Sequence, residues 1–309
     1  MDLGKHSLCL RTAAAGLAVA LALCAFAAEP PAGPALRASA PASAPAAPAV
    51  TAAPASAPAA APGPPTATGA PVPAGAAEFK PFIFLHTGDP EIGSPDLSGT
   101  VRRFAMLAKR ATDAGAALVV VSGDITRHGS DEELQATRDA LRRFTVPVLL
   151  VPGNHDEPEV FRKNFGEDHR VFTHNNCDFV CANSNLLDES PTSGSPEAKA
   201  QWKWLEEALA ASRRAGRTHI FLVIHHPIAD DAPLAALLAK HGVEAVLCGH
   251  LHTTEESRGK GFVTYVTTGT AKFRDTQGLG YRVFKVAKDR IEQEFVPLEK
   301  VVEPAKAAG

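Results

Sequence analysis

The chain has 309 residues, a formal net charge of −3 and five cysteines. A charge this close to balance, without a basic stripe, gives no reason to expect nucleic acid or an anionic membrane as a partner. Only Cys177, Cys181 and Cys248 lie outside the N-terminal segment. A strand over 177–181 would hold the first two about 13 Å apart, which is too far for a disulfide, so we expect no disulfide scaffold.

Residues 1–28 have the three-part pattern of a secretory signal peptide: a basic start, an apolar stretch and a small-residue end that predicts cleavage after about Ala27. The apolar stretch is short for a membrane span of roughly 20 residues. The chain is therefore predicted to be exported, to the periplasm or the cell exterior, with no transmembrane helix after cleavage. A lipid anchor at Cys24 is the less favoured alternative, because Leu23 stands where a lipoprotein box has a small residue.

A low-complexity segment follows. Residues 31–77 are almost entirely Ala, Pro, Ser, Gly, Thr and Val, a composition that cannot build a core. We therefore predict a disordered linker over 29–78, long enough to hold a domain on the order of 100 Å from an attachment point. One folded domain is expected over 79–300, followed by a short tail at 301–309.

Eight short apolar, β-branched runs predict strands buried on both faces. They are residues 82–85, 117–121, 146–151, 178–184, 219–224, 244–248, 262–268 and 281–286. Helical periodicity fills 99–115, 130–144 and 196–216, and the second of these opens with a Ser130–Glu133 capping box. The alternation predicts an α/β domain that begins with parallel pairing. Because no helix separates the last two strands, we expect them to form a second, more mixed or antiparallel sheet.

Polar side chains directly follow five of these predicted strands. They are Asp89 and Glu91, then Asp124, then Asn154 and His155, then His225 and His226, and last His250 and His252. Ligands of open α/β sheets bind beyond the carboxyl ends of the strands, so these residues are expected to converge. Carboxylates, an amide and imidazoles without a thiolate are ligands for Mn, Fe, Zn or Mg.

The spacing of these groups suggests how they face an ion. Pro90 favours an extended conformation for Asp89, and residues i and i+2 of an extended segment point to the same side. Asp89 and Glu91 are therefore expected to face one ion, and the same holds for His250 and His252.

Four short motifs occur in order: "GD" at 123–124, "GNHD" at 153–156, "HHP" at 225–227 and "GHLH" at 249–252. Together they resemble the calcineurin-like metallophosphoesterases, over about residues 82–287. The resemblance implies a four-layer α/β/β/α sandwich of two mixed sheets flanked by helices. It also implies two divalent metal ions and a hydrolase that acts on phosphoesters.

The resemblance assigns roles residue by residue. Asp124 would bridge two metals. One metal would be completed by three residues: Asn154, His225 and His250. Asp89 and His252 would serve the other, and His155 would face the phosphate as a proton donor or charge stabiliser.

Glu91 departs from the family's first motif, which usually reads Asp-x-His; a branch of the family reads Asp-Pro-Gln. As an oxygen ligand, Glu91 would favour Mn, Mg or Fe over Zn. The alternative is that it forms a salt bridge or faces solvent. Arg127, just past Asp124, is read as an exposed loop arginine in preference to a phosphate contact.

The leading functional hypothesis is a hydrolase in which a metal-bridging hydroxide attacks a small phosphomonoester or phosphodiester in line. His155 would act as general acid. A cyclic-nucleotide phosphodiesterase is an alternative within this class. The alternative from another class is an inactive metal-binding domain displayed on a stalk. Loops at 185–198 and 273–280 are expected to shape the substrate pocket.

Overall fold

The computed structural model describes residues 79–298, except 260, 268 and 271–277. The predicted signal peptide, Cys24, the linker, the C-terminal tail and most of the 273–280 loop lie outside the described residues. The elements follow in the order β1 (Phe82–Thr87), α1 (Leu97–Asp113), β2 (Leu118–Ser122), α2 (Asp131–Leu141), β3 (Val148–Val151), α3 (Pro158–Phe165), β4 (Arg170–His174), β5 (Cys177–Cys181), α4 (Ser184–Leu187), α5 (Pro196–Arg214), β6 (His219–Val223), α6 (Ala232–His241), β7 (Ala245–Cys248), β8 (Glu255–Arg258), β9 (Val263–Val266), β10 (Gly280–Val286) and β11 (Ile291–Pro297).

The described strands form two mixed sheets. One has the order β11-β10-β1-β2-β3, and the other has the order β4-β5-β6-β7-β9-β8. Strands β1, β2 and β3 are parallel, as expected, and so are β5, β6, β7 and β9. The edge strands β4 and β8 are antiparallel to their neighbours.

The last two predicted strands do not form a sheet of their own, so that expectation was wrong. Strand β9 pairs with β7 and β8 in the six-stranded sheet, whereas β10 runs antiparallel to β1 in the five-stranded sheet. The pairing of β10 with β1 covers the edge of β1 that β2 leaves open. Strands that are neighbours in sequence often pair, but a strand can instead pair with the open edge of a strand far away in sequence.

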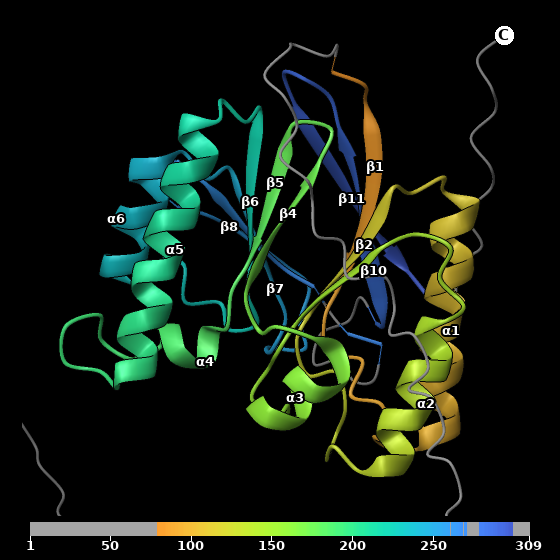
Figure 1. Ribbon diagram of the computed structural model, residues 1–309. Helices are drawn as coiled ribbons and strands as arrows, with labels where there is room; N and C mark the ends of the chain where they lie inside the picture. Colours follow the sequence, from red (N-terminus) through yellow and green to blue (C-terminus); the bar gives the residue numbers. More distant parts are fainter. Residues whose placement is uncertain (1–78, 260, 268, 271–277, 299–309) are drawn as a thin grey trace, which may run out of the picture. The chain divides into compact units, whose positions relative to one another are not determined.

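The two sheets lie between two sets of helices, which gives the four layers (Figure 1). Helices α1 and α2 cover one sheet through an outer core that includes Phe104 and Leu134, and α3 adds Phe161 to it. Helices α5 and α6 cover the other through a core that includes Leu205 and Leu238. A third apolar cluster fills the space between the sheets. The predicted α/β/β/α sandwich is confirmed.

Strands β2, β5, β6 and β7 are buried along their whole length, whereas β10 has an exposed residue at Lys285. Successive residues of a strand point to opposite sides, so a fully buried strand packs in two cores. In β1, Leu85 packs in the outer core and Phe84 in the core between the sheets. The ring of Phe84 lies 4.6 Å from Phe284, 5.1 Å from Phe179 and 5.3 Å from Phe221, measured between centroids. These rings join strands of both sheets into one core.

Local signals explain the helix starts. The predicted capping box is present: the side chain of Ser130 accepts from Glu133 N, and the side chain of Glu133 accepts from Ser130 N.

Cys177 and Cys181 occupy the two ends of β5 and are free thiols, as the strand spacing predicted. Among the described residues, no helix has both the length and the apolar character needed to cross a membrane.

Candidate metal and active site

The predicted site residues come together at the carboxyl ends of five strands. Strands β1, β2 and β3 of one sheet and β6 and β7 of the other end beside one another. Close backbone contact makes this possible: a Cβ atom on Gly88, after β1, would lie 2.9 Å from the Cα of Gly249, after β7. The convergence expected from the strand ends is therefore a feature of the structure.

A buried floor forms the inner part of the site. Its members are each at most 5% exposed: Asp89, Glu91, Asp124, His225 and His252. His225 Nε2 lies 3.3 Å from Asp124 Oδ2. His252 Nε2 lies 3.8 Å from Asp89 Oδ1 and 3.6 Å from Glu91 Oε1.

A more accessible rim forms the outer part. It consists of Asn154, His155, His226 and His250, which are half-buried or exposed. Asn154 Oδ1 lies 3.1 Å from His225 Nε2 and 2.9 Å from His250 Nδ1, so it joins the rim to the floor. A molecule from solvent would meet the rim first and reach the carboxylates behind it.

The backbone at the site is left-handed rather than extended, which corrects the expected conformation. The φ angles are 44° at Asp89, 35° at Glu91, 50° at Asp124, 71° at His250 and 55° at His252. The extended i and i+2 geometry was therefore wrong for both pairs, although each pair still lies in the site. Non-glycine residues with positive φ are strained, and such strain concentrates at functional sites.

Hydrogen bonds hold this strained backbone in place. Asp89 N donates to Gly123 O at 3.1 Å, and Glu91 N donates to Asp124 O at 2.8 Å. His250 N donates to both carboxylate oxygens of Asp89 at 3.0 Å. The loops after β1, β2 and β7 therefore fix one another, and no single strand determines the conformation alone.

The electrostatics of the floor favour a bound cation. Burial raises the pKa of Asp89 to about 7, with the nearby carboxylates of Asp124 and Glu91 adding to the effect. Burial alone would lower the pKa of His225, but Asp124 and Asp89 raise it to about 9. Without another cation, the positive charge beside Asp89 and Asp124 comes from His225, while Arg127 lies 3.4 Å from Glu91. A divalent ion would supply that charge and release His225 Nε2 as a ligand, while Nδ1 donates to Ser122 O at 2.8 Å.

Three groups of described side chains have ligand atoms close enough to hold a metal ion. They are Asp89, Asp124 and His225; Glu91, Asp124 and His155; and His225, His226 and His250. Asp124 belongs to two groups, which fits a carboxylate between two ions. The grouping of Glu91 with Asp124 places Glu91 within reach of an ion. The assignment of each residue to a particular ion stays a prediction.

Two residues at the site were undervalued from the sequence. Arg127 is not an exposed loop arginine: its side chain is 29% exposed, and its Nη1 lies 2.9 Å from His155 Nε2 and 3.4 Å from Glu91 Oε1. Ser184 is fully buried, and its Oγ accepts from the backbone N–H groups of His225 and His226. Ser184 lies three residues past the end of β5, but the sequence predicted a strand over 178–184, so the strand-end rule did not reach it.

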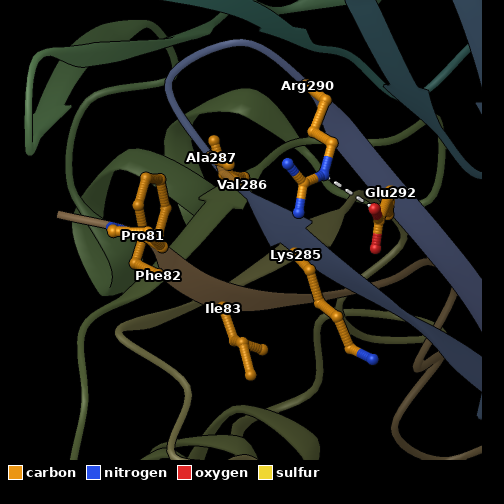
Figure 2. A pocket seen from close by; sticks show the side chains of 8 residues that line it. All are labelled: Pro81, Phe82, Ile83, Lys285, Val286, Ala287, Arg290 and Glu292. Carbon is orange, nitrogen blue, oxygen red and sulfur yellow. Dashed lines mark hydrogen bonds and ion pairs between the residues drawn. The ribbon is translucent and has the colours of Figure 1, made fainter. Parts of the chain in front are cut away.

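A separate pocket of about 350 Å³ lies at the opposite end of β1 and β10 (Figure 2). Phe82, Ile83 and Val286 supply its apolar wall, and Arg290 Nε donates to Glu292 Oε1 at 2.8 Å on its rim. Because the site residues follow the last residues of β1, this pocket does not adjoin them.

Comparisons with known proteins place the chain in a family. The family described as "Calcineurin-like phosphoesterase" matches residues 82–254, more than half of the chain. A curated protein from Arcobacter nitrofigilis, "Probable glycerophosphodiester phosphodiesterase GpdQ", is 29% identical over 156 residues, which cover 44% of this chain and 56% of that protein. The chain thus spans about half the length of this relative.

Two further similarities agree with the match. A "Probable cyclic nucleotide phosphodiesterase" from Vesicomyosocius okutanii is 27% identical over 183 residues, 54% of this chain and 76% of that protein. A dimetal phosphatase from Danio rerio shares the fold, with a TM-score of 0.56 and 17% identity over 70% of this chain and 96% of that one. The ordered motifs, the four-layer sandwich and the family match lead to one conclusion: the chain belongs to the calcineurin-like phosphoesterase family.

Proposed function

We propose that this protein hydrolyses small phosphoesters with the help of two divalent metal ions held at the ends of β1, β2, β3, β6 and β7. The observation that carries the proposal is the position of Asp124, which is buried and shared by two groups of potential metal ligands. We assign Asn154, His225 and His250 to one ion. We assign Asp89, Glu91 and His252 to the other, and Asp124 to both.

The bound ions would supply a hydroxide nucleophile near neutral pH and would offset negative charge on the phosphoryl group. The protein supplies position. The N–H of His155 donates to Asp124 Oδ1 at 2.9 Å, which ties the start of the His155 side chain to the floor. His155 then stands on the rim as the general acid for the leaving oxygen. Arg127 Nη1 lies 2.9 Å from Nε2 of this ring, so the guanidinium and the general acid lie side by side on the rim.

The test combines metal content with turnover. The purified protein is analysed for bound metal and assayed with p-nitrophenyl phosphate and bis-p-nitrophenyl phosphate in the presence of Mn, Fe, Zn or Mg. We expect about two metals per chain and metal-dependent release of nitrophenolate. Asp124→Asn should lower both metal content and turnover. His155→Gln should lower turnover by about 10²–10⁴-fold with metal content unchanged.

A cyclic-nucleotide phosphodiesterase is the second candidate, and the similarity to the Vesicomyosocius okutanii protein supports it. A cyclic nucleotide is a phosphodiester, so this candidate predicts faster hydrolysis of bis-p-nitrophenyl phosphate than of the monoester. A protein that binds metal but hydrolyses neither ester would instead support a binding domain without activity.

The signal-peptide pattern at residues 1–28 supports an exported enzyme. We propose that it acts outside the cytoplasm on small phosphoesters. Fractionation of the expressing cells tests this directly. A protein that stays in the cytoplasm with residues 1–28 intact would contradict it.

A further inference from the structure

Arg127 occupies a position that the backbone fixes. Its N–H donates to Ile92 O at 3.0 Å, and Ile92 N donates to Ile125 O at 3.0 Å. Ile92 and Thr126 form a parallel bridge. The loop after β2 therefore runs alongside the loop after β1, and this pairing sets Arg127 beside Glu91.

The side chain of Arg127 lies between the floor and the rim. Its Nη1 is 3.4 Å from Oε1 of Glu91, which is 1% exposed, and 2.9 Å from Nε2 of His155 on the rim. Glu91 thus holds the guanidinium at its buried end. An arginine has five N–H donors in a rigid fork, so donors remain for a ligand on the rim.

The pairing also explains how the chain tolerates Glu91. Where the family's first motif has a neutral histidine, this chain has an acid, which adds a negative charge to a site with two buried aspartates, Asp89 and Asp124. Arg127 returns one positive charge at 3.4 Å from Glu91. Arg127 thereby offsets the charge of Glu91 and places a positive charge toward the rim.

We propose that Arg127 binds a terminal phosphoryl oxygen of the substrate and makes phosphomonoesters the preferred substrate class; this inference rests on the proposed function. A monoester phosphoryl group has three terminal oxygens and about two negative charges. A diester has two terminal oxygens and one charge. A guanidinium beside His155 matches the third charged oxygen of a monoester, whereas a diester places an uncharged alkoxy group there.

The experiment compares two anions and four proteins. Inorganic phosphate represents the monoester end, and dimethyl phosphate represents the diester end. Their dissociation constants are measured by calorimetry on four metal-loaded proteins: the wild type, Arg127→Gln, Arg127→Lys and Arg143→Gln. Arg143 is exposed just after α2, so its replacement makes the same charge change away from the site. Metal content and the ratio of kcat/KM for p-nitrophenyl phosphate and bis-p-nitrophenyl phosphate are measured on the same samples.

Arg127→Gln should weaken phosphate binding by about 10- to 100-fold, the loss of one charge-assisted hydrogen bond, and dimethyl phosphate binding by less than about threefold. The ratio of kcat/KM should shift toward the diester by a similar factor, with metal content unchanged. Arg143→Gln should match the wild type. Arg127→Lys keeps the charge but lacks the planar fork of donors. Its phosphate affinity should therefore fall between those of the wild type and Arg127→Gln.

Several results would overturn the inference. If Arg127→Gln weakens the binding of both anions equally, or of neither, Arg127 does not bind the third phosphoryl oxygen. Loss of metal in Arg127→Gln would show that it acts on the metal site through Glu91 instead. In these cases the wild type still hydrolyses esters. A wild type that binds no metal and hydrolyses neither ester would overturn the proposed function itself, and this inference with it.

Discussion

Replacing Ser184 with alanine tests how the fold positions the histidines of the site. Ser184 Oγ accepts from His225 N at 3.1 Å and from His226 N at 3.0 Å, and it lies 3.0 Å from His226 Nδ1. A hydroxyl has two acceptor sites and one donor, so all three are used and the O–H donates to Nδ1. This fits a neutral His226, because burial, followed by the charges of His225 and His250, lowers its pKa to about 4.

The magnitude follows from the groups left behind in Ser184→Ala. Two backbone N–H groups lose their acceptor, at about 1–3 kcal/mol for each buried donor. His225 is fully buried, whereas His226 is only half-buried, so water can hydrogen-bond to the N–H of His226 after the substitution. We expect the free energy of unfolding to fall by about 2–4 kcal/mol. Metal affinity should fall about 10- to 100-fold, which is the usual effect of removing a residue that positions a metal ligand by a hydrogen bond.

Urea unfolding measures the stability change, and an unchanged m-value confirms that the native fold persists. Ser190→Ala is the matched control. Ser190 Oγ also accepts from two backbone N–H groups, Thr192 N and Ser193 N, but it is exposed, so water replaces it. The control should change stability by less than about 0.5 kcal/mol. If Ser184→Ala costs no more than Ser190→Ala, the reasoning about the buried N–H groups is wrong.

Three further predictions concern the core, pH and metal. Phe84→Ala, which empties the fully buried centre of the aromatic cluster, should lower the free energy of unfolding by about 3–5 kcal/mol in urea; a loss under 1 kcal/mol would contradict the packing. Burial alone would lower the pKa of His219, but hydrogen bonds with Glu244 and Ala287 O raise it above 6.5. The protonated ring therefore stabilises the folded protein fully below pH 6.5, and this stabilisation is lost as pH rises through the raised pKa. His219→Gln should reduce that loss of stability as pH rises above 6.5, and an unchanged slope of stability against pH would exclude the ion pair. Removing metal with a chelator should lower the melting temperature, and added Mn should restore it, because a bound ion offsets the buried acids Asp89 and Asp124; an unchanged melting temperature would argue against a metal site.

Local sequence patterns predicted many of the strands, the start of α2 and the convergence of the site residues. The apolar β-branched runs predicted eight strands, and the Ser130–Glu133 pair predicted the start of α2, because each signal lies within a few residues. The strand-end rule predicted the convergence of Asp89, Asp124, Asn154, His225 and His250, because parallel strands share the edge at which they end. Order along the chain was enough for these features.

Other elements escaped because their signals were weak. Strand β8 is exposed along its whole length and has no apolar run. Helices α3 and α4 have only eight and four residues. Such elements exist because a neighbour supplies the hydrogen bonds or the apolar surface, and a sequence pattern does not include the neighbour.

Only the tertiary structure decided the details on which the chemistry depends. The separation of β9 and β10 into different sheets follows from which strand edges were open. The left-handed conformation at Asp89 and Glu91 is held by bonds to the loop after β2, more than 30 residues away in sequence. Arg127 joins the site for the same reason. Local propensity sets where strands end, whereas strain, charge pairing and the direction of a side chain depend on groups that only folding brings within reach.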